Sequence, residues 1–240
     1  MSFRRSFDDD DFPRDAYVRA AKRRQTAADF ARMLEAEGEI LEPAVSRGKA
    51  VASSFWGRAW CRAVESWQDY DSRLPAGRSL LKNGAVIDLK LSRSLAEARV
   101  AADQLYRVRI VFSDAEPEQT DRLRQRCAGK LTSLVDLLEG RLSEEVISLI
   151  CDPDSGLFPR YGELKTICTC IDDAVLCRHA AAALYAIAPR LDEKPELFFT
   201  LRGIDPADFF AASDAIAAAS EKPELSAEEL SEAFGIDIEI

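Results

Sequence analysis

The chain has 240 residues, 47% of them hydrophobic and 31% charged, and a formal net charge of −10 at pH 7. This length is sufficient to bury a hydrophobic core in one or two domains. The acidic balance argues against a general polyanion-binding protein, because lysine and arginine supply most non-specific affinity for phosphates. No apolar run approaches the ~20 residues of a membrane span and no segment resembles a signal peptide, so we expect a cytoplasmic protein without a membrane partner.

Helix signals come first along the chain. Thr26 with Asp29 is typical of a helix start, and Gly38 of a helix end. A second helix is predicted where apolar residues recur at helical spacing, at Trp56, Trp60, Val64 and Trp67. We expect these tryptophans to pack in the core rather than to stack on bases.

Strand signals follow. Asn83-Gly84 between two short apolar runs predicts a β-hairpin turn. Two segments alternate apolar with polar residues and predict neighbouring strands that share one apolar face: Ile87, Leu89, Leu91 and Val108, Ile110, Phe112. The opposite face would carry the basic residues Lys90, Arg107 and Arg109, with Arg99 on a strand between. That face is either a site for phosphate contacts or the solvated side of an antiparallel sheet.

The next segments are mainly helical. A long amphipathic helix is predicted from its apolar positions: Leu123, Cys127, Leu131, Leu134 and Leu138. Another helix is expected to start near Ser143. Asp205-Pro206 is typical of the start of an alanine-rich helix, and Ser226 with Glu229 forms a capping box for a last one.

Three cysteines and the chain's one histidine gather within twelve residues. The motif is Cys168-Thr169-Cys170, six further residues, and Cys177-Arg178-His179. Three thiolates and one imidazole form the ligand set of a closed structural zinc site. Buried free thiols, a disulfide or a redox pair are the alternatives, although a redox pair usually has the spacing Cys-x-x-Cys.

Zinc binding restricts the backbone of this motif. Cys168 and Cys170 would lie roughly 6.6 Å apart on an extended strand, whereas tetrahedral zinc needs sulfurs about 3.8 Å apart. We therefore expect the strand to curl near Thr169. Cys177 and His179 can reach one ion only at the entry of a helix, which we expect to run to Ala188 and to end at Pro189.

The pattern Cys-x-Cys-x6-Cys-x-His, followed at once by a helix, resembles the SWIM-type zinc finger of bacterial proteins. The likeness covers about residues 16 to 205 and includes Ser54–Cys61, Tyr70–Pro75, Asn83–Leu89, Gly156–Pro159 and Leu191–Leu197. It implies Zn²⁺ bound by Cys168, Cys170, Cys177 and His179. It also implies contacts with DNA or with proteins such as Swi/Snf-type helicase-like ATPases, and no enzymatic activity of the finger. Many relatives have Pro-Asp-Trp where this chain has Ile171-Asp172-Asp173, so an aromatic surface is missing here.

We therefore predict an α+β fold in four parts. They are a helical N-terminal segment (1–50), an α+β domain with a small antiparallel sheet (51–152), a ββα-like SWIM finger with following helices (153–203), and an acidic helical tail (204–240). Residues 51–112 hold ten basic and six acidic side chains, whereas residues 203–240 hold one basic and ten acidic.

Two functions are consistent with these features. The first is a zinc-stabilised accessory or adaptor protein that docks on a partner such as a helicase-like ATPase. The alternative is direct binding of DNA or another nucleic acid through the basic 51–112 block, with contacts from Arg58, Arg62, Arg73, Arg78, Lys90, Arg107 and Arg109. We do not expect an enzyme, because the one histidine is assigned to the metal and the scattered glycines form no phosphate-binding loop.

Overall fold

The computed structural model describes residues 12–46, 48, 50–67, 73–128, 130, 143–152, 155–172 and 174–220. Its longer helices are α1 (Phe12–Ala36), α2 (Phe55–Ser66), α3 (Leu74–Lys82), α4 (Pro117–Cys127), α7 (Arg178–Glu193) and α9 (Pro206–Ser220). The short helices are α6 (Glu144–Ile150), η2 (Tyr161–Glu163) and α8 (Leu197–Leu201). The strands are β1 (Val86–Ser92), β2 (Leu95–Ala101), β3 (Leu105–Phe112) and β4 (Leu164–Cys168). The predicted α+β class is confirmed.

The four strands form one antiparallel sheet in the order β1-β2-β3-β4. β1, β2 and β3 follow one another along the chain. The two segments predicted from their alternation, β1 and β3, are not direct neighbours, because β2, which carries Arg99, lies between them. β4 joins from much farther along the sequence and pairs Cys168 with Val108 and Leu164 with Phe112. The strand that carries the first candidate metal ligand is therefore an edge strand of the same sheet.

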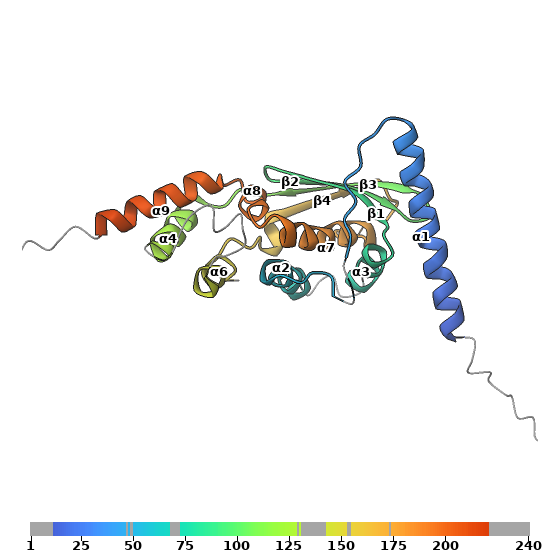
Figure 1. Cartoon of the computed structure of the whole chain (residues 1–240), viewed down its shortest axis with the longest axis horizontal. Helices are drawn as coiled ribbons and strands as arrows, with labels where there is room; N and C mark the ends of the chain where they lie inside the picture. Colours follow the sequence, from blue (N-terminus) through green and yellow to red (C-terminus); the bar gives the residue numbers. More distant parts are fainter. Residues whose placement is uncertain are drawn as a thin grey trace, which may run out of the picture.

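Helix α7 is the centre of the molecule. It lies between the sheet on one side and α2 and α3 on the other (Figure 1). Every residue from His179 to Pro189 is buried, which is typical of a helix that is covered on all sides. Its alanines allow close packing: a Cβ on Gly77 of α3 would lie 2.5 Å from the Cβ of Ala181 and 2.7 Å from its carbonyl carbon.

Hydrogen bonds fix the C-terminal half of α7. The indole Nε1 of Trp60 donates to the carbonyl of Leu184 at 2.8 Å. The carboxylate of Asp192 accepts hydrogen bonds from the backbone N–H and the hydroxyl of both Ser53 and Ser54. Since Ser54 is the N-cap of α2, Asp192 joins the end of one helix to the start of another.

Helix α1 packs against β1 and β2 through a small separate core of Ala27, Leu34, Ile87 and Ala101 (Figure 1). The position of Ile87 corrects the prediction that it shares one face with Leu89 and Leu91. The pairing of β1 with β2 shifts between Val86 and Asp88, and this bulge turns Ile87 away from the main core.

Two local predictions were wrong, one about a helix start and one about a hairpin turn. α1 begins at Phe12 rather than near Thr26, although it ends before Gly38 as expected. Asn83-Gly84 does not close a hairpin. Asn83 is the C-cap of α3 and Gly84 has φ 71°, because the apolar run before it is a helix rather than a strand.

The helix of the metal motif is also longer than predicted. Pro189 lies inside α7 and does not end it, since the helix continues to Glu193. Ser143 caps α6 and Asp205 accepts a hydrogen bond from the N–H of Ala207, as predicted for both helix starts. The predicted long helix through Leu123 and Leu138 is interrupted, because α4 ends at Cys127 with Ala128 as its C-cap. Its predicted positions 131–138 and the capping box at 226–229 lie outside the described residues. None of the described helices is long and apolar enough to cross a membrane.

Candidate metal centre

The four candidate ligands come from a strand end, a bend and a helix start. β4 ends at Cys168, and the chain bends at Thr169 and Cys170. Thr169 holds this bend against β3, because its N–H donates to the carbonyl of Arg107 and its hydroxyl accepts from the N–H of Arg107, each at 3.1 Å. The expected curl near Thr169 is confirmed. Cys177 is the N-cap of α7 and His179 lies in its first turn.

The four ligand atoms converge. The three sulfurs and the closest histidine nitrogen all lie within 4.8 Å of one another. Nδ1 of His179 is 3.9 Å from Sγ of Cys168 and 4.0 Å from Sγ of Cys177. Tetrahedral bonds of about 2.3 Å to sulfur and about 2.0 Å to nitrogen place such atoms roughly 3.6 to 3.8 Å apart. The residues therefore fit one metal ion and can hold it.

The start of α7 favours a thiolate at Cys177. Its Sγ accepts the N–H of Ala180 at 3.4 Å, at the positive end of the helix dipole. The hydrogen bond from the Cys168 thiol holds the pKa of Cys177 far below its usual value, and His179 and the N–H of Ala180 lower it further. The same bond raises the pKa of Cys168, which gives the proton. Deprotonated sulfur is the form that binds metals.

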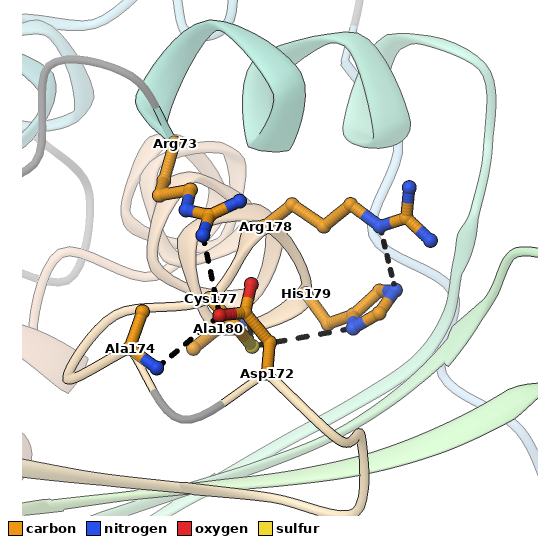
Figure 2. A network of polar contacts seen from close by, with 7 residues as sticks. All are labelled: Arg73, Asp172, Ala174, Cys177, Arg178, His179 and Ala180. Carbon is orange, nitrogen blue, oxygen red and sulfur yellow. Dashed lines mark hydrogen bonds and ion pairs between the residues drawn. The ribbon is translucent and has the colours of Figure 1, made fainter.

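The imidazole is held in one orientation. The ring of His179 stacks on Tyr106 with centroids 3.9 Å apart and an angle of 17° between the planes. Nε of Arg178 lies 3.2 Å from Nε2 of His179, while Nδ1, the other ring nitrogen, faces the sulfurs (Figure 2). Asp103 receives hydrogen bonds from Arg178 and from the Tyr106 hydroxyl, each at 3.0 Å.

The loop between the ligand pairs has its own polar anchor. Asp172 accepts hydrogen bonds from Arg73 and from the N–H of Ala174, both at 3.2 Å (Figure 2). The sequence motif did not indicate Tyr106, Asp103 or Asp172 as partners of the site. The contacts of Tyr106 and Asp103 with the site, and that of Asp172 with Arg73, join segments that are far apart in the chain, and no local spacing reveals such pairs.

The basic residues predicted on the sheet do lie on its outer face, but a carboxylate interrupts them. In the strand register, Glu97 of β2 lies between Lys90 of β1 and Arg109 of β3. Nε of Arg109 is 3.1 Å from Oε1 of Glu97. Arg99 is engaged by Glu39 and Asp88. Arg107 is exposed on the same face.

The other predicted basic contacts lie on α2 and α3, across α7 from the sheet (Figure 1). They also have structural partners, which are Ser53 for Arg58, the Phe55 ring for Arg62, Asp172 for Arg73, and Glu65 and the Tyr185 ring for Arg78. The structure therefore does not bring the seven basic residues onto one surface. Nucleic-acid binding through the 51–112 block stays a prediction.

The chain is similar to a protein of Mycobacterium tuberculosis (strain ATCC 25618 / H37Rv) named Uncharacterized protein Rv2102, with 30% identity over 165 residues. The aligned region covers 68% of this chain and 59% of that protein. No family model matches the chain. No solved structure matches it either.

Proposed function

We propose that this chain is a zinc-binding accessory or adaptor protein of the SWIM type, and that its zinc is structural. The observation that carries the proposal is the convergence of Cys168, Cys170, Cys177 and His179 within 4.8 Å at the start of the central helix. Thiolate and imidazole donors in this number select zinc over magnesium or calcium, which prefer oxygen ligands.

A structural role follows from the number and the place of the donors. Four protein ligands complete a tetrahedral shell and leave no position for water or substrate. The ion would join the edge strand β4 to α7, and α7 is in contact with β1, β2, β3, α2 and α3. We propose that the centre stabilises the fold and performs no catalysis.

The adaptor part of the proposal is supported by exposed apolar side chains in the loop of the centre and on the two strands next to it. Ile171 is 100% exposed and Val175 69% exposed in the loop between the ligand pairs. Val111 and Ile167, on the outer face of the adjacent strands β3 and β4, are also exposed. Apolar side chains gathered on a surface mark protein interaction sites. The proposed partner is a Swi/Snf-type helicase-like ATPase.

Elemental analysis tests the metal. Purified wild-type chain is expected to contain one zinc per molecule, and the Cys168→Ser variant is expected to contain none. Cys151→Ser is the matched control, because Cys151 lies outside the cluster and should leave the zinc content unchanged. Full zinc content in Cys168→Ser would overturn the ligand assignment.

Co-purification tests the adaptor role. A tagged chain is expressed in its own host, and the recovered Swi/Snf-type ATPase is quantified by mass spectrometry. The Ile171→Asp/Val175→Asp variant is expected to lose the ATPase. Ile40→Asp/Val45→Asp is the control, because those residues are also exposed but lie between α1 and α2. Equal recovery of the ATPase with both variants would contradict docking through the loop. Zinc content measured on the same samples shows whether a loss of the ATPase is instead caused by loss of the metal.

A further inference from the structure

A cavity of about 670 Å³ lies between α1 and α3, beside the metal centre. Its floor includes Ala102 and Asp103, which follow β2, and Arg178 at the start of α7. Arg178 and Asp103 also line the smaller cavity that contains His179 and Cys170. The α1–α3 cavity is thus a neighbour of the proposed zinc site, but no candidate zinc ligand lines it.

The wall that α1 contributes is basic. It consists of Arg19, Lys22, Arg23 and Thr26, whose spacing places them on one face of the helix. The facing wall is formed by Ala76, Ser79 and Leu80 of α3. Arg178 is a fourth cation, and Asp103 is the one carboxylate among the described residues that line the cavity. The cavity therefore carries a net charge of +3, four cations and one anion, in a chain whose net charge is −10.

Two of these cations are available to a ligand. Within the described part of the chain, no ion pair joins Lys22 or Arg23 to a carboxylate, and Arg23 makes only a long hydrogen bond of 3.4 Å to the hydroxyl of Ser79. Arg178 is held at 3.0 Å from Asp103, which orients its guanidinium at the cavity floor. Arg32 of α1, by contrast, is paired with Asp29, and Arg73 at the N-cap of α3 is paired with Asp172.

We propose that the α1–α3 cavity binds a small ligand with two or three adjacent phosphate groups. Several cations around one cavity match a ligand that carries several negative charges close together, and arginine binds phosphate oxygens with paired N–H donors. A volume of about 670 Å³ is within the usual range of small-molecule sites. The ligand is compact rather than a long polymer, because the cations lie on one wall and at the floor of a hollow between two helices. This inference goes beyond the adaptor role and does not depend on the metal.

Calorimetric titration of the zinc-loaded 240-residue chain with inorganic tripolyphosphate tests the proposal. The Lys22→Glu/Arg23→Glu variant is expected to bind at least about tenfold more weakly, because charge-assisted contacts are replaced by repulsion. The matched control is Arg24→Glu/Arg32→Glu, which changes the charge of the same helix equally at positions that do not line the cavity. It should weaken binding by less than about twofold at physiological salt.

Three results would overturn the proposal: no binding of tripolyphosphate by the wild-type chain, equal losses in both variants, or binding of a single-stranded oligonucleotide alone. Melting temperatures show whether each variant is folded. Zinc content after the titration shows whether heat came from extraction of the metal by tripolyphosphate. A chain that binds the anion but no zinc would sustain this inference while overturning the proposed zinc site.

Discussion

The two ends of α7 are held in different ways. At its N-terminus, the thiol and imidazole groups of Cys177 and His179 face two cysteines that follow the edge of the sheet. At its C-terminus, Asp192 accepts four hydrogen bonds from Ser53 and Ser54, and Arg190 donates to the carbonyl of Glu42 at 2.8 Å. One end of the helix has a cluster that could hold an ion from outside the chain, whereas the other is held only by the chain's own groups.

The stabilisation of the N-terminal end of α7 would depend on the supply of metal, whereas that of the C-terminal end would not. Structural zinc sites contribute on the order of 10–16 kcal/mol of apparent binding free energy at neutral pH, and metal availability controls that contribution. Hydrogen bonds to a charged group contribute about 1.5–3 kcal/mol each and are always present in the folded chain. We expect loss of the metal to destabilise the start of α7 far more than any single substitution destabilises its end.

The largest effect is expected from Cys177→Ser. Serine is a good N-cap, so the substitution keeps the cap of α7 and removes a metal ligand. We expect a loss of at least about 5 kcal/mol of unfolding free energy, or a fall of about 10–20 °C in Tm, because much of the binding energy is folding energy. Thermal unfolding with and without a zinc chelator measures this. If the chelator leaves the Tm of the wild-type chain unchanged, the N-terminal end of α7 does not depend on a metal.

A smaller effect is expected from Asp192→Ala at the other end. The substitution removes the acceptor of four hydrogen bonds, but Ser53 is exposed and Ser54 half-buried, so their donors can bond to water instead. We therefore expect the free energy of unfolding to fall by about 3 kcal/mol, less than the sum of the four bonds. Denaturant unfolding of the zinc-loaded chain measures it. Glu193→Ala is the control, because that exposed side chain should cost less than about 1 kcal/mol. Similar losses in both variants would contradict the assigned role of Asp192.

A substitution that disturbs the packing at the middle of α7 should destabilise the chain less than either of these two. A Cβ at position 77 would lie 2.7 Å from the backbone of Ala181 and Ala182, so Gly77→Ala must push α3 away from α7. Overpacking of this kind should destabilise the chain by about 2 kcal/mol, measured by denaturant unfolding. Gly162→Ala is the control, since its Cβ would meet no atom within 4 Å. Unchanged stability of Gly77→Ala would show that the two helices can separate without cost.

Metal removal should have its smallest effect on the alkylation rate of the three thiols outside the centre, Cys61, Cys127 and Cys151. Burial raises the pKa of Cys61 and of Cys127 to about 11, and burial also raises the pKa of Cys151. At pH 8 only about one in a thousand of the Cys61 and Cys127 groups is a thiolate, and this fraction grows as the pH rises toward 11. Alkylation followed by mass spectrometry should label the three ligand cysteines first once a chelator is added. Labelling of Cys127 at the same rate would show that metal loss opens the whole core.

The candidate metal centre was predictable because its signal is local. Ligand type, spacing and the helix entry all lie between residues 168 and 179, and the curl at Thr169 followed from the distance between sulfurs alone. The residues that orient the imidazole were not predictable. Tyr106 and Asp103 reach His179 and Arg178 only because β3 and the turn before it lie beside the start of α7, and that proximity depends on the whole fold.

The fold, too, was predictable where the signal is local and not where it depends on distant contacts. Helix α2 and strands β1 and β3 follow from apolar periodicity. The prediction at Asn83-Gly84 was wrong because the same dipeptide suits a hairpin turn and a helix C-cap. Which of the two forms depends on what the preceding apolar run packs against, and here that run is the helix α3. The predicted orientation of Ile87 was wrong because of the bulge in β1. One extra residue moves a side chain to the other face of the sheet, although the alternation in the sequence is unchanged.

The pairing of β4 with β3 has a consequence for the order of folding. Val108 and Cys168 are partners in the sheet although 60 positions separate them, whereas the four metal ligands span only twelve. Contacts between distant positions form slowly, because a long loop must close before they gain anything. We expect zinc to organise the short segment while the rest of the chain is still unstructured, so that β4 and α7 dock onto the hairpins as one preformed unit. Ion capture would then precede and accelerate completion of the sheet.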